Sequence, residues 1–131
     1  MGPTEAFASF ALHLDARSLS PVIVQEARRH ITDGIGAALA GWNDPCSRIM
    51  IARARKRGGP QESTIWGEGS RVNAQDAALV NGTISHTLDY DDTDYSMPGH
   101  PTVCVLPAVI AMGERVGGFR ADADIEAHGG L

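Results

Sequence analysis

Long apolar runs, cysteine and lysine are scarce in this sequence, and each scarcity excludes a class of protein. No apolar stretch approaches the roughly 20 residues of a membrane-spanning helix, so no membrane span is expected. The two cysteines, Cys46 and Cys104, lie far apart in the chain, which predicts reduced thiols packed as small apolar side chains rather than a disulfide framework. The N-terminus has Glu5 and no basic segment before its apolar residues, so we expect no secretory signal and a cytoplasmic location.

Positive charge is also limited, because the formal net charge is −5. An acidic balance disfavours a nucleic-acid partner. Basic residues gather most densely in the segment 48–57, which contains the chain's single lysine, Lys56. Cations are favoured near the C-terminal end of a helix, so we interpret this cluster as a solvated helix face and regard phosphate binding as the weaker alternative.

The length of 131 residues and the hydrophobic content of 43% are those of one domain with a packed core. We assign this domain to residues 1–118. The remaining segment, 119–131, has few large apolar residues and ends in Gly-Gly-Leu, so we predict a disordered or divergent tail.

Apolar spacing and capping signals predict helices along most of the domain. Residues 7–14 carry one apolar stripe at helical spacing, which indicates a short helix. Ser20 followed by Pro21 is typical of a helix start, and the segment 21–41 combines helical spacing with small residues. A helix with small side chains can approach a neighbouring helix closely, so we expect this one to be buried in a bundle.

Three more helices are expected further along. One begins after Asp44, runs to about residue 57 and is stopped by Gly-Gly-Pro; a second begins after Asn73; a third runs from about 101 to 116 and is closed by two glycines. Pro107 lies inside the third and is expected to kink it or reset its start. Between them, the segment 63–71 reads as a loop or a very short extended piece. The predicted fold class is therefore all-α, a helical bundle.

An irregular, aspartate-rich loop joins the last two of these helices. The segment 85–102 reads SHTLDYDDTDYSMPGHPT and places four aspartates within six residues, namely Asp89, Asp91, Asp92 and Asp94. His86 and His100 bracket them. Four like charges at the C-terminal end of a helix repel one another and oppose its dipole, so stability alone does not explain the crowding.

Three functional readings of this loop compete with a simple turn. A calcium loop of the EF-hand type is excluded, because Asp94 and His100 stand where glycine and glutamate are needed. A transition-metal site built from the two histidines and an aspartate is chemically suitable but matches no known spacing. An acid/base site would use one aspartate as proton acceptor with a histidine nearby. On spacing alone, that reading and a cluster of caps and turns remain equally favoured.

A resemblance favours the acid/base reading. The stretch 78–117 reads ALVNGTISHTLDYDDTDYSMPGHPTVCVLPAVIAMGERVG and resembles the signature of the MmgE/PrpD family. Further similarity lies in EARRHITDGIGAALAGW (26–42) and TIWGEGSRVNAQDAALVNG (64–82), so the resemblance covers about residues 5–118. It implies the N-terminal part of a large all-helical domain, which in this family is closed by an α+β lid.

The resemblance also implies a function. The family's enzymes act on di- or tricarboxylates without metal or organic cofactor, abstracting a proton next to a carboxylate and then losing water or carbon dioxide or re-protonating. It implies catalytic roles for Asp89, Thr93 and His100, and it places His86 and Asp92 at the substrate. Asp91 and Asp92 match family positions that are expected to be mainly structural, and His86 fits either role.

The chain departs from the family in its cations and its length. Family sites also use later lysines, a histidine and a tyrosine, and Lys56 lies upstream of the motif, so most of the electrostatic clamp on a carboxylate substrate is missing. We therefore expect an N-terminal portion of a 2-methylcitrate dehydratase-like enzyme, a truncation or excerpt, inactive alone and prone to form dimers through exposed apolar faces. The alternative is a stand-alone small helical protein that binds a ligand or partner.

Overall fold

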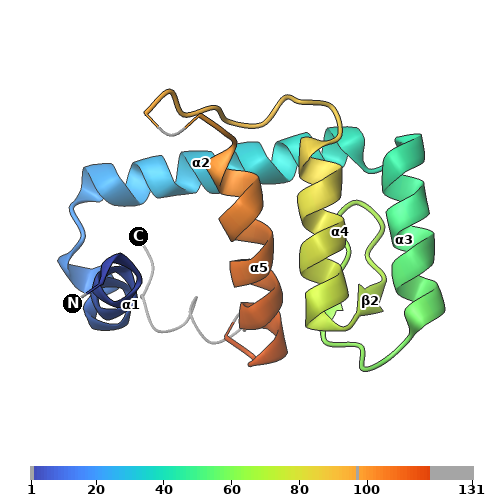
Figure 1. Cartoon of the computed structure of the whole chain (residues 1–131), viewed down its shortest axis with the longest axis horizontal. Helices are drawn as coiled ribbons and strands as arrows, with labels where there is room; N and C mark the ends of the chain where they lie inside the picture. Colours follow the sequence, from blue (N-terminus) through green and yellow to red (C-terminus); the bar gives the residue numbers. More distant parts are fainter. Residues whose placement is uncertain (1, 97, 119–131) are drawn as a thin grey trace, which may run out of the picture.

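The computed structural model describes residues 2–96 and 98–118, and it confirms a mostly helical chain (Figure 1). The predicted tail, 119–131, lies outside the described residues. The elements in chain order are α1 (Pro3–His13), the short 3₁₀ helix η1 (Ala16–Ser18), α2 (Pro21–Gly41), α3 (Pro45–Arg57), β1 (Ser63–Thr64), β2 (Arg71–Val72), α4 (Ala74–His86) and α5 (Pro101–Arg115).

Three of the described helices, α2, α3 and α4, begin at the capping residues that the sequence indicates. The side chain of Ser20 accepts a hydrogen bond from the backbone N–H of Ile23, and Asp44 caps α3 in the same way. Asn73 caps α4 by accepting from the backbone N–H of Asp76. Each cap satisfies an N–H group that has no partner within its helix, so these boundaries are set by local sequence.

The helix ends are equally local. Gly58 ends α3 with φ 67°, a left-handed conformation that costs glycine little. At the end of α5, Gly118 donates its N–H to the carbonyl of Gly113 and Gly117 donates to Glu114, the bond pair of a Schellman motif. Both predicted stops are confirmed.

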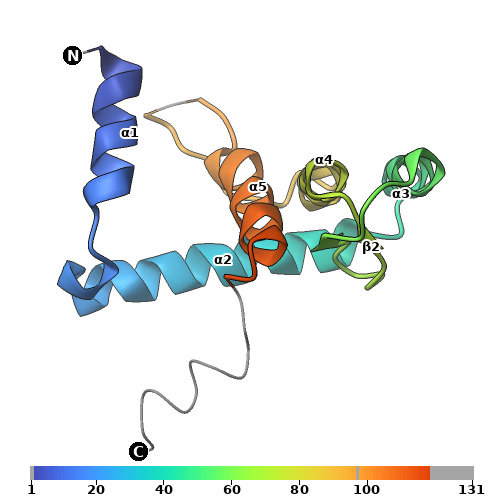
Figure 2. The ribbon, with the colours of Figure 1, turned by 90° about the horizontal axis from the view of Figure 1, so that it is seen from below.

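The long helix α2 crosses α5 and α4, which lie side by side against it, and α3 packs on the other side of α4 (Figures 1 and 2). The strands β1 and β2 form a two-stranded antiparallel hairpin between α3 and α4, which confirms the short extended piece expected in this segment. The Ser63 hydroxyl donates to the Ala111 carbonyl, and Glu114 accepts from the backbone N–H of Thr64. Both bonds hold the hairpin against α5.

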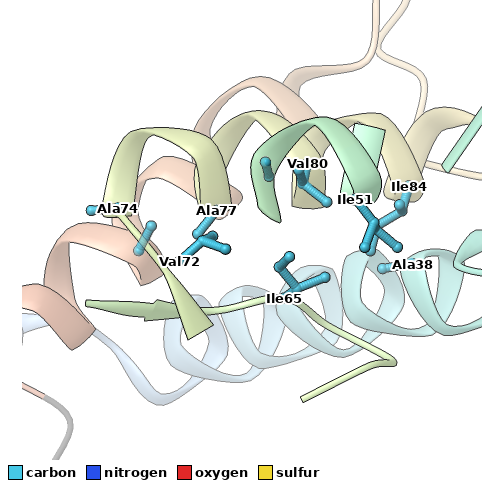
Figure 3. Packing of buried hydrophobic residues seen from close by; sticks show 10 residues of the cluster. Ala38, Ile51, Ile65, Val72, Ala74, Ala77, Val80 and Ile84 are labelled. Atoms are coloured by element: carbon cyan, nitrogen blue, oxygen red, sulfur yellow. The ribbon is translucent and has the colours of Figure 1, made fainter. Parts of the chain in front are cut away.

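The core lies where α2, α3, α4 and the hairpin meet (Figure 3). Its side chains are mostly small or branched, which permits short distances between the helices. The labelled members of this cluster are Ala38, Ile51, Ile65, Val72, Ala74, Ala77, Val80 and Ile84. Ile65 and Ile84 are fully buried, so the hairpin and α4 contribute the centre of the core.

Only the C-terminal half of α2 is buried, which corrects the expectation of a helix buried throughout. Its buried residues are Gly34, Ala37, Ala38 and Gly41. An added Cβ at Gly34 would lie 3.0 Å from Cγ2 of Thr102, so α5 approaches the helix closely there. Toward the N-terminus, Ala27 and Ile31 are exposed, because the described residues provide no helix that covers them.

The first helix has the predicted stripe but no core partner. No residue of α1 is buried, and Phe7 and Phe10 are 75% and 65% exposed. Figure 2 shows α1 standing away from the layer of α3, α4 and α5. An apolar stripe predicts a face that can be buried; it does not say what buries it.

Both cysteines are free, as expected, but both are exposed, so the expectation that they pack as small apolar residues was wrong. Cys46 and Cys104 line the same shallow groove, between the start of α3 and the facing sides of α4 and α5. Their side chains lie on the outer side of these helices, away from the core cluster. Sequence spacing does not show this, because the outward face depends on how the helices pack.

Pro107 lies inside α5 without resetting the start of the helix, which runs unbroken from Pro101 to Arg115. Proline has no N–H for the carbonyl four residues earlier, which is that of Val103. That carbonyl oxygen faces α4, and an added Cβ at Gly82 would lie 3.3 Å from it. The close contact between α4 and α5 therefore occurs where Pro107 frees a backbone acceptor.

The basic cluster of 48–57 is partly paired within the chain. Arg57 donates to Asp76 at 2.9 Å, and the carboxylate of Asp76 is nearly fully buried. Arg55 forms an ion pair with Glu68, and Arg48 donates to the side chain of Asn43. These contacts favour a structural role for the cluster. In the part of the chain that the structure describes, no helix is both long enough and apolar enough to cross a membrane.

Candidate active site in the loop between α4 and α5

Two histidines stand at the two ends of the aspartate-rich loop. His86 is the last residue of α4 and His100 is the N-cap residue of α5. The side-by-side packing of these helices brings the ring centroids to 4.6 Å, with an interplanar angle of 63°. The loop itself arches over this end of the two helices (Figure 1). Residues 14 positions apart thus form one site because of the helix pair.

The carboxylate of Asp91 contacts a nitrogen of each imidazole ring. Its side chain is completely buried, and its two oxygens are 3.0 and 3.2 Å from Nδ1 of His86. Nδ1 of His100 lies 3.1 Å from Oδ2 of the same carboxylate, but without the angle of a good hydrogen bond. One buried carboxylate therefore holds two histidines.

Asp89 lies on the open side of this cluster. Its backbone has φ 56°, a left-handed conformation that aspartate tolerates better than most residues, and its N–H donates to the carbonyl of His86. The side chain is 77% exposed, and its Oδ1 is 3.5 Å from Nε2 of His100. An exposed carboxylate thus lies next to a histidine whose other nitrogen faces a buried carboxylate.

The other two aspartates have structural contacts. Asp92 accepts from both the backbone N–H and the hydroxyl of Thr102, at 3.2 and 2.7 Å, and so caps the first turn of α5. Asp94 accepts from the backbone and side chain of Ser96 in a turn. The crowded aspartates therefore divide between an acid/base cluster, Asp89 and Asp91, and caps and turns, Asp92 and Asp94.

The structure brings together only part of the predicted site. Asp89, His86 and His100 lie in one cluster. Thr93 is exposed and lines a different hollow with Asp92, on the side that faces α2. Thr93 therefore lies away from the imidazole rings of His86 and His100. The catalytic and substrate-binding roles of the five predicted site residues stay predictions.

Two residues of this region were underrated or missed by sequence reasoning. Asp91, expected to be mainly structural, occupies the centre of the cluster. His30 on α2 was not considered, yet its Nδ1 is 3.9 Å from Oδ2 of Asp92. His30 lies in the stretch 26–42 that resembles the family, but its contact with Asp92 depends on the way α2 passes the loop, which the sequence does not show.

The cluster offers donors for proton transfer and, in principle, for a metal ion. One ligand atom from each of His86, Asp89, Asp91 and His100 lies within 4.8 Å of the others. Two imidazoles and two carboxylates are a donor set that suits zinc. The same atoms are already arranged as imidazole–carboxylate pairs, which is the arrangement that acid/base chemistry requires.

The fold and the cluster define a helical protein with an imidazole–carboxylate site at one end of a helix pair. A family model described as the MmgE/PrpD N-terminal domain matches residues 5–124. The chain therefore belongs to the MmgE/PrpD family, as its sequence motifs imply.

Curated relatives include three cis-aconitate decarboxylases. The chain is 32% identical to that of Homo sapiens and 30% identical to that of Mus musculus, each over 112 residues, and 26% identical to that of Aspergillus terreus over 113 residues. These matches cover 85% or 86% of the chain but only 23% of each relative. The chain thus spans less than a quarter of the length of the proteins it matches.

Proposed function

We propose that this chain forms one wall of the active site of a lyase that acts on a small di- or tricarboxylate by acid/base proton transfer. Asp89 accepts a proton from the carbon next to a substrate carboxylate. His100 binds that carboxylate or returns the proton, while His86, Asp92 and Thr93 contact the substrate. Dehydration and epimerisation begin with removal of that proton, whereas a decarboxylation begins with loss of carbon dioxide and ends when His100 supplies a proton to carbon.

The observation that carries the proposal is the pair formed by Asp89 and His100. The carboxylate of Asp89 is open to solvent, and therefore to a substrate, while His100 contacts the buried Asp91 on its far side. A base that a substrate can reach, next to an imidazole held by another group, is the geometry of a proton-transfer site. A loop whose aspartates only cap helices and form turns does not require this geometry.

The curated relatives favour cis-aconitate as the substrate. All three are named cis-aconitate decarboxylases, whereas the sequence motifs alone left dehydration, decarboxylation and epimerisation open. We therefore propose decarboxylation of cis-aconitate or of a closely similar tricarboxylate. The bond to one carboxylate breaks, carbon dioxide leaves, the electron pair shifts the double bond, and the carbon at its far end takes a proton from His100. The competing substrate to test beside it is 2-methylcitrate, whose dehydration would use Asp89 as the base.

The chain alone is proposed to bind its substrate weakly and not to turn it over. A tricarboxylate carries three negative charges, and the cluster itself contributes two carboxylates and no arginine or lysine among the described residues. Electrostatic stabilisation of developing charge is usually the largest contribution to catalysis. The cations that complete the site would come from protein beyond this segment.

His100→Gln is expected to weaken the binding of cis-aconitate by about tenfold, roughly 1.4 kcal/mol, because it removes a group that can carry positive charge next to Asp89. Binding is measured by titrating the ¹⁵N-labelled chain with cis-aconitate and following amide and imidazole signals. His13→Gln is the matched control, since His13 is an exposed histidine on α1 whose ring contacts Ser9 of the same helix.

Shifts centred on residues 86–100 that are lost in His100→Gln and kept in His13→Gln would support the proposal. A wild-type chain with no saturable response to cis-aconitate or 2-methylcitrate would refute it, and so would equal binding by both variants. Release of carbon dioxide is measured in the same samples.

We also propose that the isolated chain forms dimers, because large apolar residues remain exposed on all five α-helices that the structure describes. Among them are Phe7 and Phe10 on α1, Ile23 on α2, and Val105 and Val109 on α5. Patches of this kind mark contact surfaces. Light scattering on the purified chain should give at least twice the monomer mass of 13.9 kDa. A monomer at all concentrations would contradict this and would favour a stand-alone binding protein.

A further inference from the structure

We propose that Asp91 is the positioning residue of this site, and that its buried carboxylate fixes the tautomer and ring orientation of both His86 and His100. This inference deepens the proposed function, because it states which nitrogen of each ring is available to a substrate. It concerns a residue that the sequence motifs place in a structural role.

The first step of the argument is burial. The Asp91 side chain has no exposed surface, whereas the neighbouring carboxylate of Asp89 is largely exposed. A buried carboxylate is costly unless it accepts hydrogen bonds or faces positive charge. The Asp91 carboxylate contacts the Nδ1 atoms of His86 and His100. The two rings therefore stabilise this carboxylate, and it constrains them in return.

The second step is the direction of donation. An ionised carboxylate only accepts hydrogen bonds, so a ring nitrogen that contacts it must carry a proton. Nδ1 of His86 lies within hydrogen-bond distance of both Asp91 oxygens. In the neutral ring, Nδ1–H then leaves Nε2 without a proton. A buried carboxylate holds the imidazole of serine-protease triads in one tautomer by the same means.

The third step concerns His100, which lies between two carboxylates. Its Nδ1 is 3.1 Å from Asp91 and its Nε2 is 3.5 Å from Asp89. When Nδ1 of His100 donates its proton to a hydrogen bond with Asp91, Nε2 is the nitrogen that faces Asp89 and the solvent. The structure thereby assigns Nε2 of His100 as the atom through which a proton passes to or from Asp89 or the substrate.

The angle at His100 adds a further detail. Its Nδ1 atom is buried and close to Asp91, yet the contact lacks hydrogen-bond geometry. Catalytic hydrogen bonds are often poorly aligned without substrate and tighten when the complex forms. His86, with two short contacts to the same carboxylate, is the better-held ring. We therefore expect the tautomer of His86 to be the more strongly fixed of the two.

The test is to read the tautomers directly in the 131-residue chain by ¹⁵N spectroscopy of the imidazole nitrogens, at a pH where both rings are neutral. In the wild type we expect His86, and to a lesser degree His100, in the Nδ1–H form. In Asp91→Asn one of the two oxygens that contact Nδ1 of His86 becomes an N–H donor in either orientation of the amide, so the Nδ1–H form of His86 loses its preference and the Nε2–H population should rise. Asp91→Glu, which keeps the carboxylate, should restore the wild-type form in part.

Asp92→Asn is the matched control, because Asp92 is the adjacent aspartate and contacts Thr102 on α5 rather than either of these rings. It should leave both tautomers unchanged even if it lowers stability. Backbone amide spectra show whether each variant is folded. The wild-type spectrum is decisive by itself if Asp91→Asn fails to fold, since His86 in the Nε2–H form would overturn the proposal.

Two other results would overturn it. One is an unchanged pair of tautomers in folded Asp91→Asn. The other is saturable binding of added Zn²⁺ that removes the proton from Nδ1 of His86, which would make the cluster a metal centre. The outcome is independent of substrate binding: a chain that ignores cis-aconitate but shows the expected tautomers would refute the proposed function and leave the role of Asp91 intact.

Discussion

Gly41→Ala is expected to lower the free energy of unfolding by about 3 kcal/mol, the upper end of the cost of forcing a methyl group into a packed contact. Gly41 is the last residue of α2 and is buried where this helix meets α4. A Cβ at this position would lie well inside the contact distance of the Ile84 carbonyl oxygen and 2.6 Å from Cγ2 of Thr87. Since the first of these is a backbone atom, one helix must move.

Gly36→Ala is the matched control, because it makes the same change five positions earlier in the same helix. A Cβ at Gly36 would have no neighbour within 4 Å. Alanine favours a helix interior over glycine by about 1 kcal/mol, so this variant should be more stable than the wild type. Both are measured by urea denaturation followed by circular dichroism. Equal stability of the two variants would show that α2 and α4 do not meet at Gly41.

Asn81→Leu is expected to lower the free energy of unfolding by about 3 kcal/mol, because it leaves two buried backbone groups without hydrogen-bond partners. The side chain of Asn81 is 1% exposed. It accepts from the backbone N–H of Trp66 at 3.0 Å and donates to the Thr64 carbonyl at 2.9 Å. These two bonds join the hairpin to α4, so their loss should also open the hairpin locally.

Gln75→Leu provides the control, since it replaces an exposed amide by leucine on the same helix. Surface changes of this kind usually stay within about 0.5 kcal/mol. Urea denaturation gives the stabilities, and hydrogen exchange at the Trp66 amide reports on the hairpin. Exchange at Trp66 that is as slow in Asn81→Leu as in the wild type would contradict the bridging role of Asn81.

The two pairs of variants examine the part of the fold that positions the candidate site. The core contacts of α4 with α2 and with the hairpin fix the helix that ends at His86. His100 depends on α5, which packs on the same helix. A shift of α4 would therefore separate the rings of His86 and His100 from Asp91 first. The outer part of the loop would be affected later.

The proposed active site also explains why so many aspartates tolerate one another. Asp91 is compensated by two imidazoles and Asp92 by the N-terminal turn of α5, where a negative charge is favoured. Asp94 belongs to a turn, and Asp89 faces solvent, which screens its charge. Four like charges coexist because each has a different environment.

Sequence alone determined where α2, α3 and α4 begin, where α3 and α5 end, and the family of this protein. Ser20, Asp44 and Asn73 cap helices through bonds to residues two or three positions away, and the two glycines after α5 act over a similar range. Such signals are legible in sequence because the groups they satisfy are sequence neighbours. The family motif likewise lies in one continuous stretch, so it identified the loop as the candidate site.

Only the tertiary structure decided which aspartate occupies the centre of that site. The four carboxylates are alike in sequence, and Asp91 differs from Asp92 because its carboxylate contacts both His86 and His100 when α4 packs against α5. Tertiary structure also decided three other features: the contact of His30 with Asp92, the exposure of the cysteines and the exposure of the apolar stripe on α1. Each depends on which helix faces which, and residues far apart in the chain set that choice through packing.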